Sequence, residues 1–153
     1  MSDKLLKQIQ LERCMLRQLL EDHRPLLDKA ELSLPDRIEC SALAAFLHGF
    51  YNGIENIFKR VAIELREDMP EGANWHQTLL EQMAKPGPRR PAVISSDLLE
   101  SLKEYLAFRH FFRHAYPFQL AWANMSHLVK NSDDVFARLE KELDLFERSL
   151  TES

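Results

Sequence analysis

The densest group of chemically versatile side chains lies in one short stretch of the chain. The segment Phe108-Arg-His-Phe-Phe-Arg-His-Ala-Tyr-Pro117 places two arginines, two histidines and a tyrosine within eight residues. Buried positions of a helical protein rarely need so many ionisable groups. We therefore expect the functional site within residues 109–116.

These residue types suit chemistry at a phosphate. Arginine offers a planar, permanently charged fork that matches phosphate oxygens. Histidine, with an ordinary pKa of roughly 6.5, can accept or donate a proton near neutral pH. Arg109 and His114 are therefore predicted to catalyse RNA cleavage by the ribose 2′-hydroxyl, with His114 moving protons and Arg109 stabilising charge on the phosphorus. His110 and Arg113 are predicted to support the phosphate site, and this chemistry needs no metal and no cofactor.

The spacing of the two catalytic candidates sets a structural condition. Five residues separate Arg109 from His114, which corresponds to about 140° around a regular helix. The pair can serve one target only if the helix ends or distorts near His114, and Pro117 supplies a reason for such an end.

The charge distribution supports a local anion site rather than a general nucleic-acid coat. The chain carries a net charge of -4, whereas proteins that coat nucleic acids are basic. Residues 85–115 nevertheless hold six basic and three acidic side chains, a local excess of three positive charges before any histidine is counted. Such a segment in an acidic protein favours focused binding of an anion.

Apolar residues recur at helical spacing along most of the chain. The pattern predicts helices over residues 2–23, 35–67, 75–85, 95 or 96 to 114 or 115, and 118–150, with a short helical piece over 26–31. Ser33 is the expected N-cap of the second helix, Asn74 with Gln77 resembles a capping box, and Ser95 or Ser96 caps the fourth helix. Gly49 and Gly53, beside an apolar stripe, predict either the close approach of a neighbouring helix or a kink.

Long helices and short connections predict an all-α fold, an antiparallel bundle of four to five helices, in one domain over residues 1–153. The proline-rich segment 86–91 excludes a helix and predicts a mobile loop, in which Arg89 and Arg90 are solvated unless the loop folds over the site. Cys14 and Cys40 are expected to be buried, reduced thiols. No secretory signal pattern and no membrane-spanning apolar run is present, so a cytoplasmic location without membrane contact is expected.

The string Arg109-x4-His114-x-Tyr116 resembles the R-x4-6-H signature of the HEPN superfamily, and more narrowly the R-x4-H-x-Y form of HepT-like toxins from HepT–MntA toxin–antitoxin modules. His110 matches the polar residue that follows the motif arginine. The segments Phe50-Tyr-Asn-Gly-Ile-Glu-Asn-Ile57 and Asn74-Trp-His-Gln-Thr-Leu-Leu80 are also similar to those of HepT-like domains.

The resemblance implies a HEPN-like bundle and a metal-independent endoribonuclease toxin. It implies a homodimer, or a higher homo-oligomer, whose two motifs meet in a shared cleft. It also implies an MNT-type nucleotidyltransferase antitoxin that attaches AMP to Tyr116. A dimer has a chemical rationale too: one histidine cannot serve at once as proton acceptor and donor, and two-fold symmetry duplicates the group.

Other interpretations of the same residues stay open. Arg109 and His114 could cap carbonyl groups at a helix end. His110 and His114 have the i, i+4 spacing of some zinc sites, although no third ligand is evident, and Tyr116 could be an ordinary half-buried tyrosine. The chain as a whole could be a non-enzymatic HEPN binding module that partners a nucleotidyltransferase, or a plain helical interaction protein.

Three further polar residues on the helical patterns are assigned structural roles. His48 and His76 are expected to lie in the core or at the surface rather than to act as catalysts. Glu55, beside the apolar stripe, is expected to pair with a basic residue.

Overall fold

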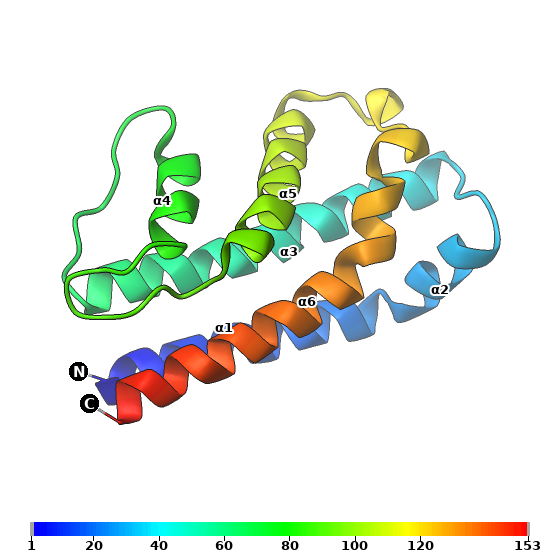
Figure 1. The fold of residues 1–153 in the computed structure, drawn as a ribbon. Coiled ribbons are helices and arrows are strands. Elements are labelled where there is room, and N and C mark those ends of the chain that lie inside the picture. Colours follow the sequence, from blue (N-terminus) through cyan, green and yellow to red (C-terminus); the bar gives the residue numbers. More distant parts are fainter. Residues whose placement is uncertain (1, 153) are drawn as a thin grey trace.

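Helices make up most of the computed structural model, which describes residues 2–152 (Figure 1). They are α1 (Ser2–Asp22), α2 (Arg24–Leu32), α3 (Arg37–Glu64), α4 (Trp75–Met83), α5 (Ser96–His114), the short 3-10 helix η1 (Pro117–Gln119) and α6 (Trp122–Thr151). No strand occurs within this range, so the all-α prediction is confirmed. Six α-helices form within the described residues, one more than the upper number expected, because the short piece expected after Pro25 is a complete helix, α2, with this proline in its first turn.

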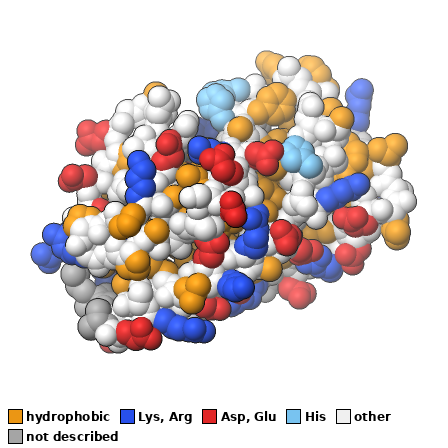
Figure 2. Space-filling view, viewed as in Figure 1, with side chains coloured by type: hydrophobic (Ala, Val, Ile, Leu, Met, Phe, Trp, Pro, Cys, Tyr) orange, Lys and Arg blue, Asp and Glu red, His pale blue; other side chains and the backbone are white. Residues whose placement is uncertain are grey.

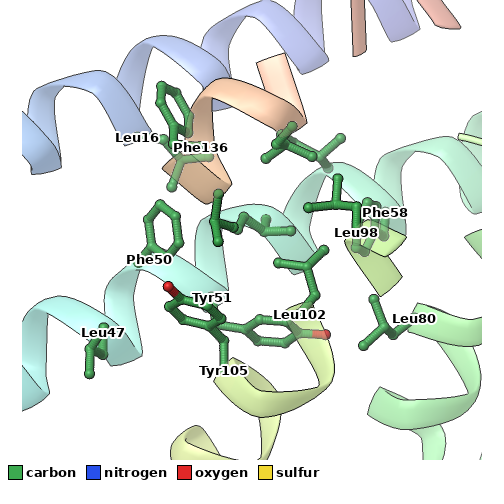
Figure 3. Packing of buried hydrophobic residues seen from close by; sticks show 14 of the residues in the cluster. Leu16, Leu47, Phe50, Tyr51, Phe58, Leu80, Leu98, Leu102, Tyr105 and Phe136 are labelled. Atoms are coloured by element: carbon green, nitrogen blue, oxygen red, sulfur yellow. The ribbon is translucent and has the colours of Figure 1, made fainter. Parts of the chain in front are cut away.

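The central element of the bundle is α3, which every other helix contacts. One side of α3 packs against α1 and another packs against α5. In Figure 1, α4 and α5 run crosswise to the axis of α3. Large side chains fill the layer between α3 and α5, among them Phe50, Tyr51, Leu102 and Tyr105 (Figure 3). The long buried stripe predicted for this part of the chain therefore forms the core.

Helices α1 and α6 run side by side, which brings the two chain ends together (Figure 1). The buried guanidinium of Arg13 on α1 binds three carboxylates of α6, those of Glu140, Asp144 and Glu147. On the other side of α1, the backbone approaches α3 closely. A Cβ atom added at Gly53 would lie only 2.6 Å from Leu16 Cδ2, so the predicted close approach of a neighbouring helix is confirmed at this position. At Gly49 the nearest atom, Leu19 Cδ2, would lie at 3.5 Å, which is an ordinary contact, so no such closeness is found there.

Two of the predicted helix caps are wrong and one is right. Helix α3 begins after Asp36, not Ser33, and Asp36 forms a reciprocal capping box with Glu39. Asn74 occupies the N-cap position of α4 but makes no side-chain cap bond, so the box with Gln77 does not form. Ser95 caps α5 as expected and accepts a hydrogen bond from the backbone of Leu98 at 3.1 Å.

The proline-rich segment is anchored, contrary to the expectation of a mobile loop with solvated arginines. Arg90 is buried, and its Nη2 lies 2.8 Å from Oε1 of Glu67. Its Nη1 also donates to the carbonyl oxygens of Lys85 and Pro91. Arg89 is exposed but donates to the carbonyl oxygen of Leu65 at 3.1 Å. Both arginines therefore hold this segment against the end of α3.

The two cysteines differ in their surroundings. Cys40 is buried as expected, whereas Cys14 is exposed on α1, where the opposite face of the helix supplies the packing. None of the helices described is both long enough and apolar enough to cross a membrane.

Candidate functional site

A groove of about 670 Å³ lies between the start of α4 and the second half of α5. Residues 72–77 form one wall, and α5 contributes five basic or ionisable side chains to the other. These are Lys103, Arg109, His110, Arg113 and His114. In Figure 2, histidine side chains gather at the top of the molecule, where α5 ends in Figure 1. The four residues singled out as catalytic or supporting thus line one groove.

Helix α5 stays regular to His114 and then stops, since Ala115 has extended backbone angles (φ -95°, ψ 143°) and Pro117 opens η1. The expected helix end at the motif is therefore confirmed. On a regular helix the four side chains fan out over about 140°, with Arg109 at one edge, His114 at the other and Arg113 and His110 between them. The groove extends across this whole fan.

Arg109 is held in place by a residue that sequence reasoning missed. Its Nε donates to Oδ1 of Asn52 on α3 at 2.7 Å. Within residues 2–152, no carboxylate pairs with its guanidinium, so its two terminal nitrogens are available to an anion in the groove. In the sequence, Asn52 is a polar residue next to the buried stripe of α3, within the segment 50–57 that resembles HepT-like domains, and nothing there marks it as a partner of Arg109.

The arginines of α5 make this part of the molecule electrostatically positive. Their charge affects the nearby imidazole of His48. Burial lowers the pKa of His48, and the positive charges of Arg109 and Arg113 lower it further. His48 itself is half-buried against Phe112, with ring centroids 5.1 Å apart, and does not line the groove. This agrees with the structural role expected for it.

The opposite wall contains a histidine bound to a buried carboxylate. Nδ1 of His76 lies 2.7 Å from Oε2 of Glu55, which is 3% exposed. The His76 ring also stacks on the indole of Trp75, with centroids 3.7 Å apart. Glu55 therefore pairs with a basic residue as expected, while His76 lies in the groove wall rather than simply in the core or at the surface.

Tyr116 and the histidine pair lie close together in sequence at the end of α5. Tyr116 does not line the groove; its side chain is 67% exposed and stacks on Phe118, with centroids 5.5 Å apart. It is therefore not half-buried. The rings of His110 and His114 meet edge to face, with centroids 5.0 Å apart. In the described part of the chain, no group of three or more metal-ligating side chains forms around them.

A helical bundle built around one long central helix, with an arginine- and histidine-lined groove at the end of α5, defines a small domain of the HEPN type. The chain belongs to the HepT-like protein family, whose match extends over residues 42–150 and so over more than half of the chain. All of the groove residues and most of α3 fall within this match, whereas α1 and α2 lie before it. No curated protein and no solved structure matches the chain.

Proposed function

We propose that this HepT-like chain is a metal-independent endoribonuclease toxin that cleaves RNA with Arg109 and His114. The observation that carries the proposal is that both side chains line one groove, where Asn52 orients the Arg109 guanidinium and no other described residue pairs with its terminal nitrogens. A preorganised cation aimed at a phosphate stabilises the charge that develops in phosphoryl transfer. His114, at the exposed end of the same helix, supplies proton transfer.

Supporting roles follow from the same groove. His110 and Arg113 lie between the two catalytic residues on α5 and add donors for the substrate phosphates. Family membership, together with the motif, supports three further parts of the proposal. The chain acts as one domain over residues 1–153, works as a homodimer or higher homo-oligomer in the cytoplasm, and is controlled by an MNT-type nucleotidyltransferase antitoxin that modifies Tyr116.

The proposal is tested by RNA cleavage in the presence of EDTA. His114→Ala should reduce the rate roughly 10²–10⁴-fold by removing proton transfer. Arg109→Ala should reduce it on the order of 10²–10³-fold, and Arg109→Lys should restore only part of the loss because a point charge cannot replace the fork.

His127→Ala is the matched control, since this histidine lies outside the groove and pairs with the exposed Glu104. It should leave the rate unchanged, and thermal melting should show that every variant folds. Full activity in His114→Ala, or cleavage by the wild type that EDTA abolishes, would contradict the mechanism.

One observation favours a second function, that of a non-enzymatic binding module. Arg109 and His114 lie at opposite edges of the α5 face, a separation that suits an extended anionic ligand as well as a single reacting phosphate. A wild-type protein that binds RNA without cutting it, and that loses binding in Arg109→Ala, would support this function instead.

A further inference from the structure

The groove contains an imidazole that the proposed reaction has not yet used. His76 is the second residue of α4 and lies in the wall opposite α5, in the same groove as His114. The motif of α5 offers no residue of comparable chemistry that is also held by a buried carboxylate.

The His76 ring is fixed from two directions. Its Nδ1 is bound to the Glu55 carboxylate at 2.7 Å, and one face of the ring stacks on Trp75. Trp75 is itself covered by the ammonium group of Lys59, 4.9 Å from the ring centroid. These contacts determine the position and the tilt of the imidazole before any substrate arrives.

The same contacts determine which ring nitrogen is bound within the protein and which is not. A carboxylate can only accept a hydrogen bond, so Nδ1 carries the proton that is donated to Glu55. Nε2 of the neutral ring then has a lone pair. Among residues 2–152 no hydrogen bond to Nε2 is formed, and the side chain, which lines the groove, is 20% exposed. A buried carboxylate that selects one tautomer of a histidine is the arrangement that prepares a general base.

We infer that His76 is a second catalytic histidine of the proposed ribonuclease, a general base positioned by Glu55. The inference rests on the proposed function and extends it, because it places the proton acceptor and the proton donor in the groove of a single chain. His114 is then needed only as the donor.

In the reaction, Nε2 of neutral His76 takes the proton of the ribose 2′-hydroxyl as the bond between O2′ and phosphorus forms. The imidazolium of His114 gives its proton to O5′ as the bond between phosphorus and O5′ breaks. The products are a 2′,3′-cyclic phosphate and a 5′-hydroxyl. His76 ends the step protonated and His114 neutral, and proton exchange with water restores both.

The test measures cleavage of two single-stranded RNA oligonucleotides of mixed sequence in EDTA. One has ordinary linkages, and the other has sulfur in place of one bridging O5′, a leaving group that departs without a proton donor. His76→Asn retains an amide that can donate to Glu55 but has no atom at the Nε2 position. His127→Asn is the matched control, because His127 also pairs with a glutamate, at 3.4 Å from Glu104, but does not line the groove.

His76→Asn should lose roughly 10²–10⁴-fold in rate on both oligonucleotides, since each needs the base. His114→Ala should lose activity on the ordinary RNA and regain most of it on the sulfur-containing RNA. His76→Ala should be rescued in part by added imidazole, which a merely structural role would not allow. His127→Asn should behave as the wild type on both.

The outcomes separate this inference from the function on which it rests. If the wild type is active and His114→Ala is not, unchanged rates in His76→Asn overturn the role of His76 and leave the proposed function standing. A loss in His76→Ala that imidazole does not restore also overturns the catalytic assignment. A wild type that cleaves neither oligonucleotide overturns both proposals.

Discussion

At the scale of single residues, the three tyrosines differ sharply in how far their side chains are exposed to solvent. Tyr51 and Tyr105 are buried, and burial raises the pKa of both phenols. The hydroxyl of Tyr105 also donates to the carbonyl oxygen of Leu128 at 2.7 Å. Tyr116 is exposed beyond the end of α5. Tyr116 is therefore the tyrosine whose hydroxyl is accessible to a modifying enzyme.

We predict that co-expression with an MNT-type nucleotidyltransferase adds AMP to Tyr116 and stops RNA cleavage. The bulky anion would lie next to the basic groove and compete with substrate phosphate for its arginines. Mass spectrometry of the intact protein and its peptides measures the adduct, and Tyr116→Phe should carry none and stay active. Silencing of the wild type with no adduct on Tyr116 would contradict the prediction.

Site residues that are close together in the sequence could be predicted, whereas those contributed by distant segments could not. Arg109, His110, Arg113 and His114 lie within six residues on one helix, so their grouping could be read directly from the spacing. Asn52 and His76 reach the same site from α3 and α4, and their side chains depend on how three helices pack. Neither contact has a local sequence pattern.

At the scale of structural elements, one buried ion pair holds the segment between α4 and α5. The side chains of Arg90 and Glu67 are 0% and 3% exposed. Burial acts to raise the pKa of Glu67, but hydrogen bonds from Arg90 and Gln82 outweigh it, and the pKa is lowered. The neighbouring Arg89 is exposed and binds only backbone carbonyl oxygens.

We predict that Arg90→Ala lowers the free energy of unfolding by about 3–5 kcal/mol, since it leaves the Glu67 carboxylate buried without a partner. Arg89→Ala, the matched control one residue away, should cost about 1 kcal/mol or less. Urea denaturation followed by circular dichroism measures both. Equal losses in the two variants would show that the ion pair does not anchor the segment.

The same pair predicts the sign of the pH dependence. Because the pKa of Glu67 is lowered in the folded state, its contribution to stability is present above the ordinary glutamate pKa of about 4.3. It is lost as the pH falls through the lowered value. In Arg90→Ala this part of the acid dependence should be reduced.

Helix positions were predictable from sequence, whereas loop structure was not. Periodic apolar residues place each long helix within a few residues of its observed bounds, as for α5, predicted from Ser95 or Ser96 to His114 or Ala115 and observed over Ser96–His114. Arg90 was expected in solvent because composition alone cannot reveal a partner 23 residues away. For the cap of α3, Asp36 and Ser33 are both suitable residue types, and only the backbone decides between them.

At the scale of the whole molecule, an apolar ledge lies next to the groove. It consists of Tyr116 and Phe118, whose exposed rings stack on each other just beyond the end of α5. With His76 in the groove, a dimer is no longer required to supply a second imidazole. The ledge gives an independent reason for two copies to meet there, since burying aromatic surface favours association.

We predict a homodimer in which the two 109–116 segments face each other across this ledge. Phe118→Asp should shift the protein to a monomer at micromolar concentration, as measured by light scattering, because it would bury a charge in the contact. Leu145→Asp, at a 57% exposed leucine on α6 outside the ledge, should leave the dimer intact. A wild-type monomer, or contacts that place the two segments on opposite faces, would contradict the prediction.

Because Trp75 stacks on His76, its fluorescence can be used to detect binding in the groove. The chain has two tryptophans, and the other, Trp122, begins α6 and does not line the groove. A Trp122→Phe protein would emit from Trp75 alone, and the neighbouring imidazole in its stack is positioned to quench that emission. Any ligand that contacts His76 should then change the fluorescence, so that occupancy of the groove can be followed in real time, before and apart from any bond cleavage.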